Sequence, residues 1–288
     1  VSRGLGDVYK RQEWQGRQFH RGGAVDYMGK HYPDFEAATG YGTGAGLCGW
    51  NCRHTFFAIF PELGAPPAWT QADLEALNAR DIEYNGGKYT RYEISQMQRA
   101  RERTVRKYKR RYLAEDAAGA DTTASAVKLR QARQELSDFI SATGGRADSA
   151  RTSVAGFGRS EAGKASYTAR KQERFDSANV ELQQMREAGT IKAKGKLIES
   201  PPAPNEINFA SEHVLQRWAE RGMGPMDAER IIRSSKVAMS QRNGTQTCYY
   251  SEYGFVAIGQ NGNVSSIGPL DEGGQKLMEV VKKHGIPH

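Results

Sequence analysis

The stretch SEHVLQRWAERG near the C-terminal end groups residues that could cleave a phosphodiester bond. At about 100° per residue, its polar side chains share one helical face: His213, Arg217, Glu220 and Arg221. An imidazole can act as general base or acid, and guanidinium groups can hold a phosphate and stabilise its developing charge. The spacing therefore suggests a metal-independent ribonuclease site, with His213 as base or acid and both arginines as phosphate clamps.

Residues outside this polar face give the site a scaffold and an alternative interpretation. Val214, Leu215 and Trp218 lie on the other side of the helix and are expected to pack on a sheet. Tyr249, Tyr250 or Ser266, on strands that follow, could add further contacts to RNA. The same spacing also fits a solvated face of ordinary charged residues, in which case the C-terminal domain is an inactive module that docks a partner.

A second group of residues that could bind a ligand lies in GYGTGAGLCGWNCRHTFF, residues 40–57. Cys48, Cys52 and His54 could supply three zinc ligands, with His31 or His20 as the fourth. The cysteine spacing is not that of a two-residue knuckle, and no second cysteine pair exists in the chain. We therefore expect no metal or other cofactor, and keep these three residues as the candidate ligands.

The glycines of the same stretch have their own interpretation. They do not follow a strand into a helix, so they match neither glycine-rich phosphate loop. The alternative is architectural: glycine supplies unusual backbone angles while Trp50, Phe56 and Phe57 become buried.

A third candidate is a basic helix. Apolar residues at spacings of three and four from Ile94 predict a long amphipathic helix. Residues 91–111 hold nine Lys and Arg against two Glu. The expected nucleic-acid contacts are Arg99, Arg103, Arg106, Lys107 and Arg110. A solvated face, or a seam against an acidic capsid protein, is equally physical.

Composition narrows the class of protein. The chain has 288 residues, a formal net charge of +8 and a hydrophobic fraction of 38%. This balance favours a small core with extended helices and acidic or nucleic-acid partners. Three cysteines do not form a secreted disulfide framework. No segment is apolar and long enough to suggest a membrane span, so no membrane partner is expected.

Turn-forming residues and changes in composition along the chain indicate the domain boundaries. Residues 13–140 combine a Gly- and aromatic-rich irregular segment with a helical hairpin at 91–140. Thr70 and Asp73 indicate a capped helix, and Asn85-Gly86 a tight hairpin. Residues 141–206 are expected to be a flexible polar linker with one further helix, and residues 207–288 a small domain with about four antiparallel strands. The fold class is multi-domain α+β.

The first twelve residues stand apart. DVYKRQ within residues 1–12 resembles the translation of a sequencing adapter. We expect residues 1–12 to be an adapter-derived scar, which leaves the rest of the chain with a net charge near +6 and without its true N-terminus.

Two resemblances suggest a function. EWQGRQF, YPDFEAATGYGTGAGLCGWNCRHTFFAIFPEL and YNGGKYTRYEISQMQRARERTVRKYKR resemble the C-terminal part of phage minor capsid proteins from Gram-positive siphoviruses and prophages, a family related to Mu F-type head morphogenesis proteins. This resemblance implies a structural role at the portal and head, and no catalytic residues.

The second resemblance covers about residues 209–269. SEHVLQRWAERGM and the strand-rich run AERIIRSSKVAMSQRNGTQTCYYSEYGFVAIGQNGNVSSIG are similar to barnase–EndoU–colicin–RelE-like nuclease domains. It implies an RNase-like toxin domain, although Ser265 and Ser266 stand where that group often has Thr.

Together these features predict a truncated phage minor capsid protein with a C-terminal, metal-independent ribonuclease-like effector domain. The alternative is a purely structural head protein whose C-terminal domain docks a partner. The expected partners are portal and capsid proteins, DNA at the basic helix and RNA at the C-terminal domain. The expected locations are the virion and, during assembly, the host cytoplasm.

Overall fold

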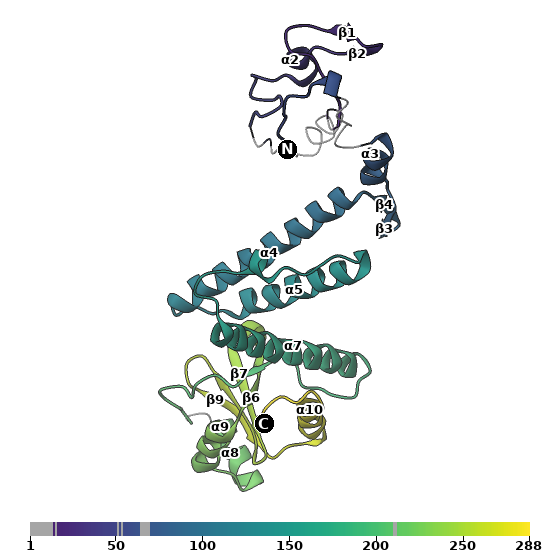
Figure 1. Ribbon diagram of the computed structural model, residues 1–288. Helices are drawn as coiled ribbons and strands as arrows, with labels where there is room; N and C mark the ends of the chain where they lie inside the picture. Colours follow the sequence, from purple (N-terminus) through teal and green to yellow (C-terminus); the bar gives the residue numbers. More distant parts are fainter. Residues whose placement is uncertain (1–13, 15, 51, 53, 64–69, 210–211) are drawn as a thin grey trace. The chain divides into compact units, whose positions relative to one another are not determined.

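The computed structural model in Figure 1 describes residues 14, 16–50, 52, 54–63, 70–209 and 212–288. The adapter-like residues 1–12 lie outside the described residues. The chain divides into two compact units, residues 1–100 with 139–146 and residues 101–138 with 147–288. Long middle helices and a C-terminal antiparallel sheet confirm the predicted α+β class.

The first unit consists mainly of short elements. They are β1 (Val25–Tyr27) paired with β2 (Lys30–Tyr32), α2 (Phe35–Thr39), a 3-10 turn (Pro61–Leu63), α3 (Gln71–Asn78), and β3 (Ile82–Tyr84) paired with β4 (Gly87–Tyr89). The predicted hairpin is confirmed: Asn85 and Gly86 both have positive φ, 47° and 77°. The predicted helix cap is also present, since Thr70 Oγ1 accepts a 3.1 Å hydrogen bond from the Asp73 N–H.

Close backbone contacts explain the glycines of residues 40–57. A Cβ on Gly46 would lie 1.8 Å from the Gly40 carbonyl oxygen, and a Cβ on Gly49 would lie 2.4 Å from that of Gly44. Neither position has room for a side chain, which supports the architectural interpretation.

The expected burial of the neighbouring aromatic residues is wrong. Trp50 is 79% exposed, Phe57 72% and Phe56 46%. Phe35 is buried instead, and the rings of Phe19, Tyr41 and Phe56 pack around it. The sequence pattern could not select among these rings because the stretch has no regular period.

The middle of the chain forms the two predicted helices. Helix α4 (Arg91–Ala117) and helix α5 (Thr123–Thr143) are joined by a turn in which Gly119 has φ of 64°. Their apolar stripes meet in a narrow core with helix α7 (Arg159–Glu187): Val105, Tyr112, Ala126, Leu129, Ala132, Ala165 and Ala169. Alanine at four of these seven positions lets the helices approach closely.

The segment predicted to be a flexible linker is instead largely structured. It contains α6 (Ser149–Thr152), the 29-residue helix α7, and strand β5 (Lys196–Glu199). Phe175, Ala178 and Leu182 of α7 are buried in the core of the C-terminal sheet. The composition of this segment predicted a linker because α7 is mostly polar and its few apolar residues do not give a strong amphipathic pattern.

The C-terminal sheet has five antiparallel strands, one more than expected. Their order is β5, β6 (Val237–Gln241), β7 (Gln246–Ser251), β8 (Gly254–Gly259) and β9 (Val264–Gly268). The additional strand is β5, which pairs with β6 through Leu197↔Met239 and Ile198↔Ala238. The folded C-terminal domain therefore begins in α7 rather than near residue 207.

Helices cover both faces of this sheet. Helices α7 and α10 (Glu272–Lys283) pack on one face, while α8 (Glu212–Arg221) and α9 (Pro225–Ser234) pack on the other (Figure 1). Successive residues of β7 alternate between the two cores: Cys248 and Tyr250 face α7 and α10, and Tyr249 faces α8 and α9. Burial on both faces explains the nearly continuous apolar runs of the central strands.

Candidate nucleic-acid interface

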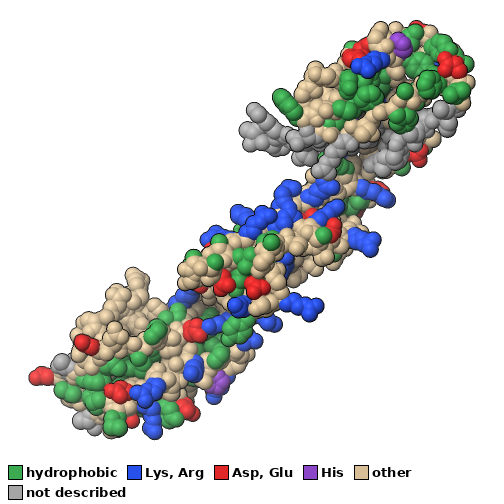
Figure 2. Space-filling view, turned by 60° about the vertical axis from the view of Figure 1, so that its left-hand side comes forward, with side chains coloured by type: hydrophobic (Ala, Val, Ile, Leu, Met, Phe, Trp, Pro, Cys, Tyr) green, Lys and Arg blue, Asp and Glu red, His purple; other side chains and the backbone are tan. Residues whose placement is uncertain are grey.

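One face of α4 presents cations to solvent. Arg103, Lys107 and Arg110 are exposed and follow the i, i+4, i+7 spacing of a single helical face. Arg99 and Arg106 lie on the same arc and are half-buried. Figure 2 shows Lys and Arg side chains gathered over the helical middle of the chain. The prediction that the basic face points outward is confirmed for three of its five residues.

Two cations of α4, Arg106 on this arc and Lys109, have structural partners. Arg106 donates a hydrogen bond to the Arg151 carbonyl, and Lys109 Nζ donates to the Thr152 carbonyl at 2.6 Å. Lys109 is buried, and burial, followed by the charge of Arg133, lowers its pKa. These two side chains hold α6 against α4, so the nine cations counted in the sequence are not one continuous ligand surface.

The exposed cations are not neutralised within the described part of the chain. No ion pair to Arg103, Lys107 or Arg110 occurs among the described residues. Glu102 is the one acidic residue between Arg99 and Arg110, and it is buried. The face therefore keeps its positive charge for an external anion.

The C-terminal candidate site is only partly visible. Helix α8 forms as predicted, but the side chains of His213 and Arg217 lie outside the described residues. On the apolar side of α8, Val214 and Trp218 are buried as expected. Leu215 is 48% exposed, which corrects the expectation that it faces the sheet.

The remaining candidates of this site are tied to the scaffold. Arg221 Nη1 donates a 2.5 Å hydrogen bond to the Ile267 carbonyl on β9. Tyr249 is buried, its hydroxyl donates to the Pro202 carbonyl at 3.2 Å, and burial raises its pKa. Ser266 is half-buried on β9. Arg221 and Tyr249 thus make contacts that stabilise the fold, whereas a catalytic role requires contact with substrate.

The candidate metal ligands lie near one another without forming a cluster. Cys52 Sγ is 3.4 Å from His54 Nδ1, and Cys48 Sγ contacts the His54 carbonyl oxygen at 3.5 Å rather than the imidazole. Among the described residues, no three His, Cys, Asp or Glu side chains gather in a metal-binding group. A carbonyl contact of this kind fits a folded loop at least as well as a zinc site.

A comparison with protein families finds a match for the N-terminal part of the chain. Residues 1–141 match the family model described as Phage minor capsid protein 2. The match supports a phage minor capsid protein, a structural role in the head and a place in the virion. No curated protein and no solved structure matches the chain. The family match includes α4 and ends in α5, so it includes the basic face but not the C-terminal sheet.

Sequence reasoning missed one group of polar residues in the second unit. Arg130, Arg133, Gln134 and Ser137 follow one face of α5 and line a hollow next to α7. Their i, i+3, i+4, i+7 spacing was the signal that could have identified them.

Within the described residues, no helix is both long enough and apolar enough to cross a membrane.

Proposed function

We propose that this protein is a structural component of the phage head that contacts DNA through the exposed face of α4. The supporting observation is the row of exposed cations Arg103, Lys107 and Arg110, which form no ion pair with any described residue and lie within the part of the chain that matches the minor capsid family. Assembly would take place in the host cytoplasm, next to portal and capsid proteins and to the packaged DNA.

The geometry suits contact with a phosphate backbone. Arg103 and Arg110 are separated by about 10 Å along the helix axis at a rise of about 1.5 Å per residue. Phosphate contacts of this kind are independent of base sequence and release counterions, so the affinity must fall as salt rises. We expect weak, sequence-independent binding, because three or four cations without groove contacts supply only the electrostatic part of recognition.

The test is fluorescence anisotropy of a labelled DNA duplex at several salt concentrations. The triple variant Arg103→Gln, Lys107→Gln, Arg110→Gln should lower the slope of log K against log salt by about 0.9 for each lost phosphate contact. The matched control removes three exposed cations elsewhere: Arg233→Gln, Lys236→Gln and Lys282→Gln. Equal losses in both variants would mean that only net charge matters and would refute an interface on α4.

For the C-terminal domain, a partner-docking module is the interpretation that the contacts favour. Arg221 and Tyr249 are engaged with backbone carbonyls. Three large apolar side chains of the domain are exposed: Leu215 of α8, Met226 of α9 and Tyr253 of the β7–β8 turn. A docked partner would bury such side chains.

Ribonuclease activity remains the second candidate because His213 and Arg217 share a turn of α8 and that helix packs on β9. The assay is cleavage of bulk RNA in the presence of a chelator by the full chain and by its His213→Ala variant. A general acid or base contributes roughly 10²–10⁴-fold to the rate. Cleavage that disappears in the variant would establish the effector interpretation, while identical traces would leave the docking module.

A further inference from the structure

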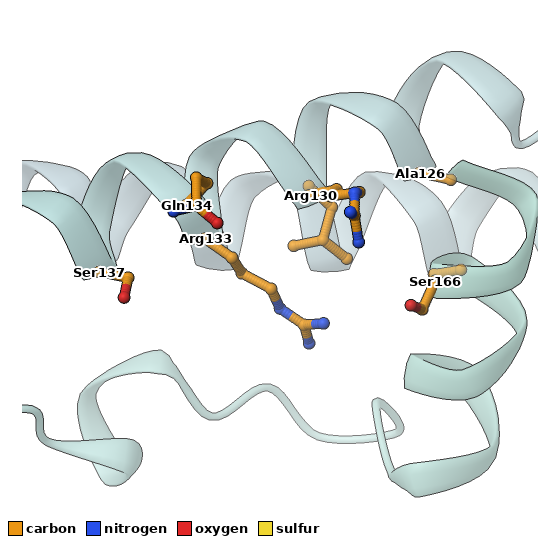
Figure 3. A pocket seen from close by; sticks show the side chains of 8 residues that line it. Ala126, Arg130, Arg133, Gln134, Ser137 and Ser166 are labelled. Carbon is orange, nitrogen blue, oxygen red and sulfur yellow. The ribbon is translucent and has the colours of Figure 1, made fainter. Parts of the chain in front are cut away.

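A hollow of about 290 Å³ lies between α5 and α7, both within the second unit. Figure 3 shows Arg130 and Arg133 extending from α5, with Ser166 on the adjacent helix. Five of its eight lining residues carry hydrogen-bond donors: Arg130, Arg133, Gln134, Ser137 and Ser166. The other three are apolar, and none is acidic. The lining is therefore suited to an anion.

Arg133 is the central cation of this hollow. Its guanidinium lies 5.6 Å from the centroid of the Phe157 ring, and no ion pair to it occurs among the described residues. Lys109 approaches the same ring at 5.4 Å, from helix α4. The buried Lys109 and the half-buried Arg133 lie around one ring and repel each other, and burial lowers the pKa of both. A bound anion would relieve this repulsion.

Two polar residues next to Arg133 already have partners within the chain. Arg130 Nε forms a 2.7 Å ion pair with Glu173, in which the side chains are 47% and 43% exposed. The Gln134 amide donates to Asp138 at 2.7 Å. An exposed ion pair contributes little and can exchange for a stronger ligand. Arg133 is thus the anchor, and Arg130 is a second guanidinium within the same lining.

We propose that this hollow binds a phosphate group, held by Arg133 and Arg130 with the hydroxyl group of Ser166. Two guanidinium forks and a hydroxyl provide more donors than the two oxygens of one carboxylate can accept, whereas a phosphate has enough oxygens and charge. The volume is several times the roughly 30 Å³ share of a water molecule, which leaves room for the ion and its hydration. The site is separate from the exposed face of α4 and does not depend on DNA binding there.

The test is calorimetric titration of the full chain with inorganic phosphate, with sodium chloride at equal ionic strength as the reference. Arg133→Gln should weaken phosphate binding roughly 10- to 100-fold, since it removes a charged hydrogen-bond donor. Arg130→Gln should weaken it less, and provides a second variant if Arg133→Gln fails to fold. The control Arg233→Gln removes the same charge from the exposed side of α9 and should leave the affinity unchanged.

Competition experiments distinguish the source of the phosphate. If the site takes a phosphate of the nucleic-acid backbone, inorganic phosphate should displace a labelled DNA duplex from the wild type but not from Arg133→Gln. If it takes free phosphate, the heat of binding persists without any displacement of DNA. The proposal is overturned by an absence of phosphate binding above the chloride reference, by an equal loss in Arg233→Gln, or by acetate binding as tightly as phosphate, which would indicate an acidic protein partner.

Discussion

Replacing Leu182 with alanine tests whether α7 belongs to the C-terminal domain. The Leu182 side chain is fully buried among residues of the sheet, including Leu197 and Met239. Removing a buried leucine side chain typically costs about 2–5 kcal/mol, through lost apolar burial and the cavity that remains. If α7 folds as one cooperative unit with the sheet, this cost must appear in strands that are distant in sequence.

The assay is native-state hydrogen exchange of the amides of β7, the central strand. Their exchange should accelerate roughly 30- to 3000-fold in Leu182→Ala, the factor that corresponds to about 2–5 kcal/mol. Val180→Ala is the matched control, because Val180 lies on the same helix and is 59% exposed, and it should change exchange by less than about threefold. Faster exchange confined to α7, with β7 unchanged, would show that the helix is a linker outside the folded core.

Three further predictions concern the cysteines. Burial raises the pKa of the Cys248 thiol to about 11, so at pH 8 an alkylating reagent should modify the exposed Cys48 and the half-exposed Cys52 but spare Cys248, as peptide mass spectrometry can check. Because the unfolded chain loses this proton first, the Cys248 contribution to the free energy of unfolding should be constant below about pH 9 and fall between about pH 9 and 11, relative to Cys248→Ala in urea titrations. The purified protein should carry no stoichiometric zinc by elemental analysis, and one equivalent of zinc that is lost in Cys52→Ala would establish the metal site.

The sequence predicted correctly those elements that a few neighbouring residues determine. Asn85-Gly86 and the Thr70–Asp73 cap require only backbone angles and short-range hydrogen bonds, and both formed as predicted. The period of α4 was also sufficient, since the spacing from Ile94 to Tyr112 places apolar residues on one side of the helix and Arg103, Lys107 and Arg110 on the other.

Long-range packing decided the rest. Strand β5 is only four residues long, and it is a strand because β6 pairs with it. The sequence of α7 shows no single apolar face because the helix contributes separate groups of apolar residues to two cores. Ala165 and Ala169 belong to the core between the helices, and Leu182 belongs to the core of the sheet. A single amphipathic pattern reports one buried face, so a helix that serves two neighbours has no such signature.

For the candidate sites too, some features follow from the local sequence and others from long-range packing. The sequence by itself determined which residues share a helical face, because that depends only on the 100° step: this gave the basic face of α4 and the polar face of α8. Tertiary structure alone decided which of those side chains are available to a ligand. Arg221, Tyr249 and Lys109 carry the right chemistry for binding phosphate or RNA, but each is held by a backbone carbonyl from a segment far away in the sequence. Such carbonyls need partners wherever folding removes them from water, and no local pattern shows which side chain will be recruited to satisfy them.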